Sequence, residues 1–257
     1  MGVNISAVAY LNAAPFIYGL QRSPLAESAT LSLDVPAVGA QKLLSGQADI
    51  ALTPVAAIPQ SSDFKIVTGY CIGATGEVAS VAIFACEPLE QLHTIYLDAH
   101  SRTSVALVQV LAREYWCISP QFKPLGSCDY MEQAESGAGY LLIGDKTFAA
   151  RRRFTCVYDL AQAWIASTGK PFVFAAWVAR RDVPAATIGL LSDALRLGVN
   201  HIGEVCREVQ PRYPDVDVAS YLTRNISYPL DAAKREGMAL FISKLPAKSG
   251  AVNPQTS

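Results

Sequence analysis

The chain alternates between short apolar runs and amphipathic stretches along most of its length. Runs rich in β-branched residues predict strands, and apolar residues spaced three or four apart predict helices. In the first part of the chain the predicted strands are 5–11, 31–34, 49–54, 64–70 and 79–84. A helix is predicted to begin at Pro36 and to stop at Gly46, the usual order of these residues at helix ends. This pattern predicts an α/β fold with mainly parallel sheets and flanking helices.

The second part of the chain repeats the alternation. Its predicted strands are 94–97, 140–143 and 172–178, with helices after Ser104 and over 159–168. A long helix over 188–206 and a last helix over 233–241 follow, and the tail from Lys248 is expected to be disordered. We therefore predict two lobes, 1–84 with 178–257 and 85–177, joined by two crossing strands. Such folds bind ligands in the cleft between the lobes.

The segment 95–104 joins a short strand to an amphipathic helix through a polar turn. Ser101, Thr103 and Ser104 fall at the N-terminus of that helix, where free backbone N–H groups and the helix dipole attract anions. Ser and Thr are also ordinary N-cap residues, so this fragment by itself favours a simple cap beside a solvated Arg102. A carboxylate site is the second interpretation.

Other polar and aromatic residues fall where a cleft would need them. Asn12, Thr53, Ser80 and Asp145 lie at or near the ends of predicted strands, although loops are polar in any case. Trp164, at helical spacing within its segment, is expected in the core. Trp177, close to a crossing strand, suits the core and the cleft equally.

Composition narrows the possible functions. Of the 257 residues 51% are hydrophobic and 17% are charged, which is typical of a compact protein with buried sheets. A formal net charge of −1, without a Lys/Arg stripe, argues against nucleic-acid binding. We find no signal-peptide pattern and no apolar stretch of bilayer length, and expect a cytoplasmic protein without a membrane partner.

The six cysteines form no Cys-x-x-Cys pair, so we expect reduced thiols and no metal or cofactor.

Six motifs occur in order between about residues 4 and 180. They are Tyr10-Leu-Asn12 with Pro15, Gly46-x-x-Asp49-Ile-Ala-Leu-x-Pro54, Ser80-Val81, Leu97-Asp98-x-x-Ser-Arg-Thr-Ser104, Leu142-Ile-Gly-Asp145, and the run from Asp159-Leu160 to Trp177. Together they resemble the chorismate dehydratases of the futalosine route to menaquinone. The resemblance implies a two-lobed fold like that of type II periplasmic binding proteins. It also implies a lyase that removes water from chorismate to give 3-[(1-carboxyvinyl)oxy]benzoate.

The resemblance also implies functional residues. Asn12 and Ser80 are the candidate catalytic residues. The resemblance also makes Ser101, Thr103 and Ser104 candidate substrate-binding residues. Their positions in the predicted cleft add Tyr10, Thr53, Arg102, Gly144, Asp145 and Trp177 as further candidates. In one place the chain departs from the family: where members often have Gly-Pro-Val-x-Ser, this chain has Gly76-Glu77-Val78-Ala79-Ser80. The charged Glu77 in place of a proline bears on how Ser80 is placed.

Histidine supplies no evident acid–base pair, because His93, His100 and His201 are scattered. Chorismate is one elimination away from an aromatic ring, so positioning can provide much of the catalysis. Two proton acceptors stay open: the enolpyruvyl carboxylate of the substrate, and a protein base such as Asp145, which suits a structural role in its turn equally well. Two other functions also stay open: the 1,4-dihydroxy-6-naphthoate synthase of the same pathway, and a non-catalytic solute-binding protein for a small carboxylate.

Overall fold

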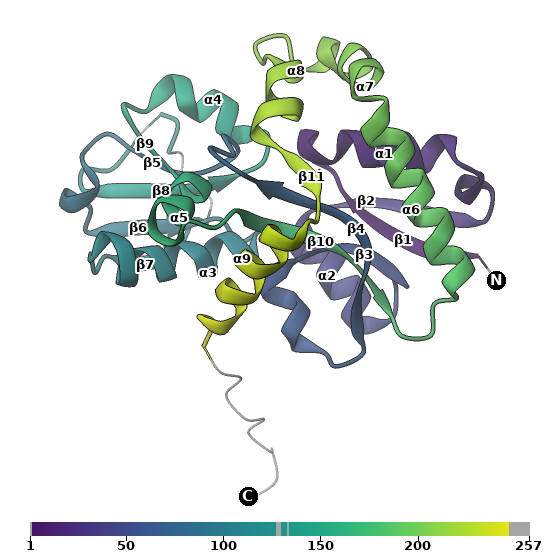
Figure 1. Cartoon of the computed structure of the whole chain (residues 1–257). Helices are drawn as coiled ribbons and strands as arrows, with labels where there is room; N and C mark the ends of the chain where they lie inside the picture. The colour runs from purple at the N-terminus through teal and green to yellow at the C-terminus, as the bar shows by residue number, and fades with distance from the viewer. Residues whose placement is uncertain (1, 127–129, 133, 247–257) are drawn as a thin grey trace, which may run out of the picture.

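The computed structural model describes residues 2–126, 130–132 and 134–246, which form two sheets flanked by helices (Figure 1). The six-stranded sheet has the order β11-β4-β10-β3-β1-β2, and its strands are Val3–Val8 (β1), Ala29–Asp34 (β2), Ile50–Pro54 (β3), Phe64–Ala74 (β4), Phe172–Arg180 (β10) and Ser227–Pro229 (β11). The five-stranded sheet has the order β7-β6-β8-β5-β9, and its strands are Val81–Ala85 (β5), Thr94–Leu97 (β6), Gln121–Pro124 (β7), Ala138–Ile143 (β8) and Cys156–Asp159 (β9).

The predicted α/β architecture with two lobes is confirmed, but the sheets are mixed rather than mainly parallel. Strands β1, β2 and β3 are parallel, as are β6, β7 and β8, whereas β10 runs antiparallel to β3 and β4. Strand β5 is likewise antiparallel to both of its neighbours. The antiparallel strands are those next to the passages between the lobes. Apolar alternation does not encode strand direction, so this feature was not predictable from the pattern.

The helices pack on both sides of the sheets. They are Ala14–Arg22 (α1), Pro36–Ser45 (α2), Arg102–Leu111 (α3), Lys146–Arg153 (α4), Leu160–Thr168 (α5), Ala185–Asn200 (α6), Ile202–Val209 (α7), Val218–Ser220 (α8) and Ala232–Ser243 (α9). Helices α1 and α6 pack together on one side of the six-stranded sheet, and α2 lies against β1 and β3 on the other (Figure 1). None of the described helices has the length and apolar character that a membrane crossing requires.

Local sequence signals explain several helix ends. Helix α2 starts with Pro36 and ends at Gly46, whose φ of 76° is left-handed, as predicted. The Asp159 carboxylate caps α5 by accepting the N–H groups of Ala161 and Gln162. Two predicted elements are wrong in extent. The first strand stops at Val8, because the chain turns into a 3₁₀ segment at Leu11–Ala13, and the predicted long helix breaks at His201.

The two passages between the lobes lie close together. Strand β4 leads into β5 through residues 75–80, and α5 leads into β10 through residues 169–171, while β4 and β10 pair with each other. The predicted lobes change after residues 84 and 177. In the structure the whole of β5 (Val81–Ala85) belongs to the five-stranded sheet, and the whole of β10 (Phe172–Arg180) belongs to the six-stranded sheet. A buried apolar run does not reveal which sheet it joins. The predicted disordered tail from Lys248 lies outside the described residues.

Candidate active site

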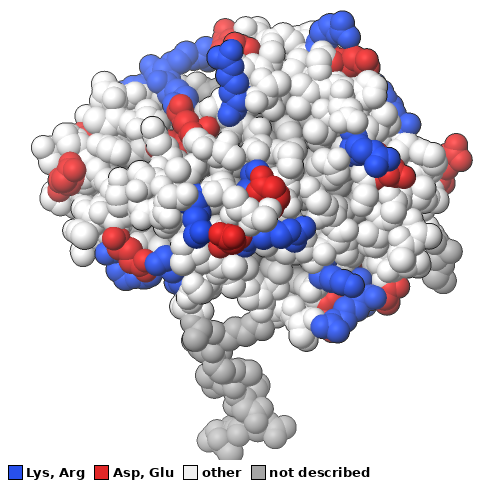
Figure 2. Space-filling view, viewed as in Figure 1, with Lys and Arg blue, Asp and Glu red and all other residues white. Residues whose placement is uncertain are grey.

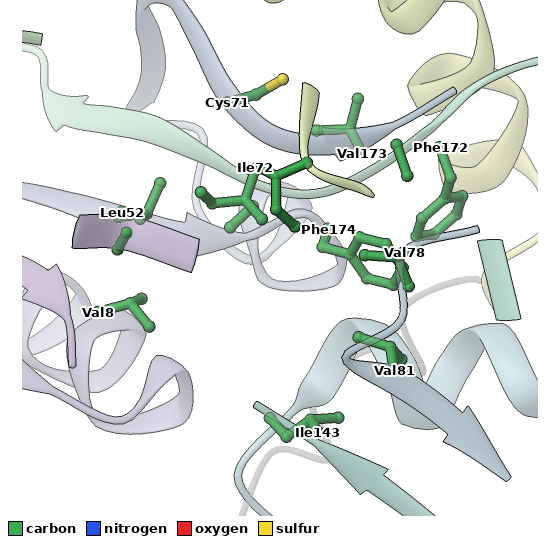
Figure 3. Close-up of a cluster of buried hydrophobic side chains, with 14 of the residues drawn as sticks. Val8, Leu52, Cys71, Ile72, Val78, Val81, Ile143, Phe172, Val173 and Phe174 are labelled. Carbon is green, nitrogen blue, oxygen red and sulfur yellow. The ribbon is translucent and has the colours of Figure 1, made fainter. Parts of the chain in front are cut away.

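A cavity of about 50 Å³ lies between the two sheets. This volume is well below the roughly 300–1,000 Å³ of small-molecule sites, so the cleft is closed in this structure. Its apolar walls come from both lobes and include Val8, Ile72, Val78, Val81, Ile143 and Phe174, which face a common space in Figure 3. Its polar lining is Tyr10, Asn12, Ser101 and Ser104. The charged side chains, in contrast, are spread over the outer surface with both signs interspersed on the face in Figure 2.

At one end of the cavity is the N-terminus of α3. Ser101 is the N-cap: its Oγ accepts the N–H of Ser104 at 3.0 Å and donates to the Ser104 hydroxyl at 2.8 Å. The turn before it is held by Asp98, which accepts the N–H of His100 and forms an ion pair with Lys146 of α4. The first amides of a helix have no intrahelical partner, so this end offers N–H groups to an anion.

Asn12 lies at another part of the cavity wall, beside two buried tyrosines. Its side-chain Oδ1 is buried and has no hydrogen-bond partner among the described residues. Its backbone carbonyl accepts the hydroxyl of Tyr228 at 3.0 Å. Tyr221 donates its hydroxyl to Ser80 Oγ at 2.7 Å. Burial raises the pKa of Tyr221, while hydrogen bonds with Ser80 and Asn12 oppose that rise. Tyr221 thus shares a buried hydrogen bond with Ser80.

Ser80 is fully buried and is not part of the cavity lining, although its sequence neighbours Val78 and Val81 are. The turn before it is strained, because Ala79 has a left-handed φ of 63°. The Asp159 carboxylate accepts the N–H groups of Val78 and Ala79. Burial raises the pKa of Asp159, and the hydrogen bonds it accepts work against that rise.

Glu77 supports the same turn in place of the family's proline. It forms an ion pair of 2.7 Å with Arg151, and Arg151 Nε donates to the carbonyl oxygen of Ala79 at 3.0 Å. Arg151 also lies 3.6 Å from the carboxylate of Asp159. Side-chain contacts therefore hold the backbone that a proline ring would stiffen.

Gly144 and Asp145 connect the five-stranded sheet to the first lobe. Gly144 has φ 70°, and a Cβ there would lie 2.8 Å from the ring of Tyr10, so only glycine fits without displacement. Asp145 accepts the N–H of Leu11 through one oxygen and the hydroxyl of Tyr213 through the other. Because both of its oxygens accept hydrogen bonds, Asp145 has a structural role in the closed cleft. Burial, and next the charges of Asp98 and Asp145, raise the pKa of Tyr10.

Of the predicted site residues, the structure brings Tyr10, Asn12, Ser101, Ser104 and Gly144 to the cavity. The others lie elsewhere. Thr53 donates to the carbonyl of Ala51 and is buried in β3. The Thr103 hydroxyl accepts the N–H of Ala56, a contact between the lobes.

Arg102 and the two tryptophans also lie away from the cavity lining. Arg102 donates to Gln60 and borders an outer groove near α9. It is not paired with Asp98, which forms an ion pair with Lys146 and has His100 Nδ1 3.6 Å away. Trp177 is buried and packs edge-on against Phe16. Trp164 is in the core, as predicted.

Sequence reasoning missed Tyr221, Tyr228 and Arg151. Tyr221 opens a short helical turn, Tyr221–Asn225, in the region after β10. No local motif marks it, because its hydrogen-bond partner Ser80 is 141 positions away along the chain. Arg151 begins the basic run 151–153, a pattern typical of a solvated helix end, and its partners Glu77 and Asp159 are not its neighbours in sequence. Within the described ranges, no group of three or more His, Cys, Asp or Glu side chains is arranged to hold a metal ion.

The fold matches solved structures over nearly the whole chain. A protein of Archaeoglobus fulgidus superposes with a TM-score of 0.74 at 13% identity, over 95% of this chain and 96% of that one. The periplasmic aliphatic sulphonate binding protein SsuA from Escherichia coli gives 0.60 at 16% identity, over 95% and 85%. A Candida albicans gene product described as having the generic periplasmic binding protein fold gives 0.61 at 10%, over 94% and 90%. The predicted class, a two-lobed α/β protein with a periplasmic-binding-protein-like fold, is confirmed.

Sequence comparison places the chain more narrowly. The model of the menaquinone biosynthesis family matches residues 3–247. The chain therefore belongs to the menaquinone biosynthesis family. A curated relative, the chorismate dehydratase of Thermus thermophilus, is 28% identical over 258 residues, which cover 92% of each protein.

Proposed function

We propose that this protein is a chorismate dehydratase, a lyase that converts chorismate into 3-[(1-carboxyvinyl)oxy]benzoate and water. The name of the Thermus thermophilus relative and the family support this activity over the two alternatives, the naphthoate synthase and a solute-binding protein. The observation that carries the proposal is the cavity between the lobes, which combines a serine-rich helix N-terminus with the unpartnered acceptor of Asn12.

One carboxylate of chorismate binds at α3 in this proposal. Ser101 and Ser104 line the cavity there, and the helix N-terminus favours an anion through its free amides and its dipole. Tyr10, packed on Gly144, covers the ring of the substrate from one side. The apolar walls exclude water, which strengthens each of these polar contacts.

The proton acceptor in the proposal is the enolpyruvyl carboxylate of the substrate. Among the described residues that line the cavity, Tyr10 is the one with a titratable side chain, and its raised pKa makes it a poor base. Asp145 is a poor candidate because both of its oxygens already accept hydrogen bonds. The ring C–H bond breaks and its proton passes to the carboxylate. The electron pair forms the new ring double bond as the C–OH bond breaks. The carboxylate passes the proton it took to the departing hydroxyl, which is released as water.

The test is direct. Purified protein is incubated with chorismate, and the mixture is separated by chromatography to follow chorismate and the aromatic ether. We expect stoichiometric conversion by the wild type. Recovery of intact chorismate after prolonged incubation contradicts the proposal, and tight chorismate binding without turnover supports the solute-binding alternative.

A further inference from the structure

Asp145 lies at the N-cap position of α4, yet it does not cap that helix. An Asp at this position ordinarily accepts N–H groups of the first turn. Among the described residues, the N–H groups of α4 find no acceptor in its side chain. One carboxylate oxygen accepts the N–H of Leu11 at 2.9 Å instead, and the other accepts the hydroxyl of Tyr213 at 2.7 Å. Both donors belong to the first lobe, so this side chain serves a contact between the lobes and not its own helix.

Three backbone amides of the first lobe donate to the second lobe around the cleft. Leu11, Ala37 and Ala56 lie in the first turns of the helical segments that follow β1, β2 and β3. Amides in a first turn have no acceptor within their own helix. Their acceptors all belong to the second lobe and are, in the same order, the carboxylate of Asp145, the carbonyl of His100 and the hydroxyl of Thr103. Parting of the lobes therefore frees all three amides together.

The bonds to Asp145 are the strongest of these contacts. The other two amide bonds are each 3.2 Å long, and a hydrogen bond to an ionised carboxylate is roughly twice as strong as one between neutral groups. Burial, and next the hydrogen bond to Asp145, raises the pKa of Tyr213 to about 12, so its phenol remains a donor at neutral pH. The ion pair between Arg152 and Asp215 also joins the lobes, but both side chains are exposed and it contributes little.

The cavity of about 50 Å³ has room for only a few water molecules, so a ligand enters and leaves when the lobes part. We propose that Tyr213 and Asp145 form a latch: Tyr213 holds the Asp145 carboxylate against Leu11, and release of this contact opens the cleft. The latch also fixes the segment that carries Tyr10 and Asn12, because Leu11 lies between them and both line the cavity. Two residues outside the cavity lining thus control the entry of a ligand.

Hydrogen exchange of the three amides, measured by NMR in ¹⁵N-labelled protein, tests the latch. Since one opening exposes Leu11, Ala37 and Ala56, we expect similar protection factors in the wild type. Tyr213→Phe keeps the ring and removes only the hydroxyl. It is expected to speed the exchange of all three amides about tenfold, the effect of one hydrogen bond to a charged group. Ala37 and Ala56 are decisive, because their hydrogen bonds do not involve the latch. Faster exchange at Leu11 alone, or at none of the three, overturns the proposal.

Two variants serve as matched controls. Tyr18→Phe removes another tyrosine hydroxyl that donates to a carboxylate, that of Glu204, but within the first lobe. Asp215→Asn breaks the exposed ion pair between the lobes. Neither is expected to change the exchange of the three amides by more than about twofold. Asp145→Asn is expected to speed it at least as much as Tyr213→Phe, because it weakens both hydrogen bonds. An effect of Asp215→Asn as large as that of Tyr213→Phe overturns the latch.

The binding of chorismate, which rests on the proposed function, gives a second measurement. Only the open form admits the ligand, so the association rate constant follows the fraction of open molecules. In stopped-flow mixing with chorismate, Tyr213→Phe is expected to associate about tenfold faster than the wild type and Tyr18→Phe. An unchanged association rate constant overturns the control of entry by the latch. If the wild type neither binds nor consumes chorismate, the proposed function fails, while the exchange of the three amides still decides the latch.

Discussion

The two polar ends of the cavity are built in opposite ways. The α3 end is local: Ser101 and Ser104 belong to one turn, and their hydroxyls bond to each other. The Asn12 end is held by residues distant in the sequence, because the Asn12 carbonyl accepts the hydroxyl of Tyr228. In the proposed function the first end binds a carboxylate of chorismate, and the second lies at the leaving hydroxyl.

The largest expected effect is at the Asn12 end. In the proposed function the Asn12 amide hydrogen-bonds the groups around the leaving hydroxyl. We therefore expect Asn12→Ala to lower kcat about a hundredfold to a thousandfold, as for other preorganised polar groups at a reacting centre. Chorismate turnover measures the loss, and circular dichroism verifies the fold. Asn200→Ala, at the exposed end of α6, is the control. A near-normal rate for Asn12→Ala would remove Asn12 from the mechanism.

Next in size is the effect at the α3 end. Ser104→Ala removes a hydroxyl that faces the carboxylate, and the KM for chorismate is expected to rise about tenfold, because a hydrogen bond to a charged group contributes about 1.5–3 kcal/mol. Ser101→Gly separates binding from capping, since glycine is a tolerable N-cap and costs only a few tenths of a kcal/mol. It should raise KM with little change in melting temperature. An unchanged KM in both variants contradicts the carboxylate site.

A smaller effect is expected in the turn before Ser80. Glu77→Gln removes the charge that pairs with Arg151 but leaves Arg151 bonded to Ala79. Because the Glu77 side chain is partly exposed, we expect less than about a fivefold loss of kcat/KM. Arg151→Ala, which also removes the bond to the Ala79 carbonyl, should lose more. A larger loss of kcat/KM in Glu77→Gln than in Arg151→Ala would mean that Glu77 acts on the site directly.

The pH dependence should be weak. The raised pKa of Tyr10 keeps its phenol protonated at neutral pH, and no other titratable side chain lines the described cavity. We therefore expect kcat to be flat from about pH 6 to 9, since substrate carboxylates titrate well below that range. Initial rates in overlapping buffers test this. A change of kcat with pH that has an apparent pKa near 7 would indicate a protein base at one of the two polar ends of the cavity.

The smallest effect is expected at Arg102, the most conspicuous residue of the α3 turn in the sequence. Its guanidinium reaches Gln60 and an outer groove, away from the cavity. Arg102→Ala is expected to change KM less than about twofold, as for a solvated surface charge. Arg102→Gln, of similar length, serves as the comparison. A tenfold rise in KM would return Arg102 to the binding site.

Much of this protein follows from local signals in the sequence. Pro36 and Gly46 delimit α2, Asp159 and Gly169 delimit α5, and Ser101 caps α3, because helix ends are set by residues within one turn. The family motifs likewise marked Asn12, Ser101 and Gly144, which line the cavity. These features depend on neighbours in the chain, so a single sequence contains them.

The remaining features were decided by the tertiary structure. Three features depend on groups far apart in sequence. They are the direction of the strands in the mixed sheets, the choice of sheet to which β5 and β10 each belong, and the contact of Tyr221 with Ser80. Asp145 is an example: its sequence context allowed a base or a turn residue, and the folded chain supplied two donors that occupy its oxygens. Local pattern sets where helices and strands begin, whereas long-range packing and hydrogen bonding set which side chains are left free to meet a ligand.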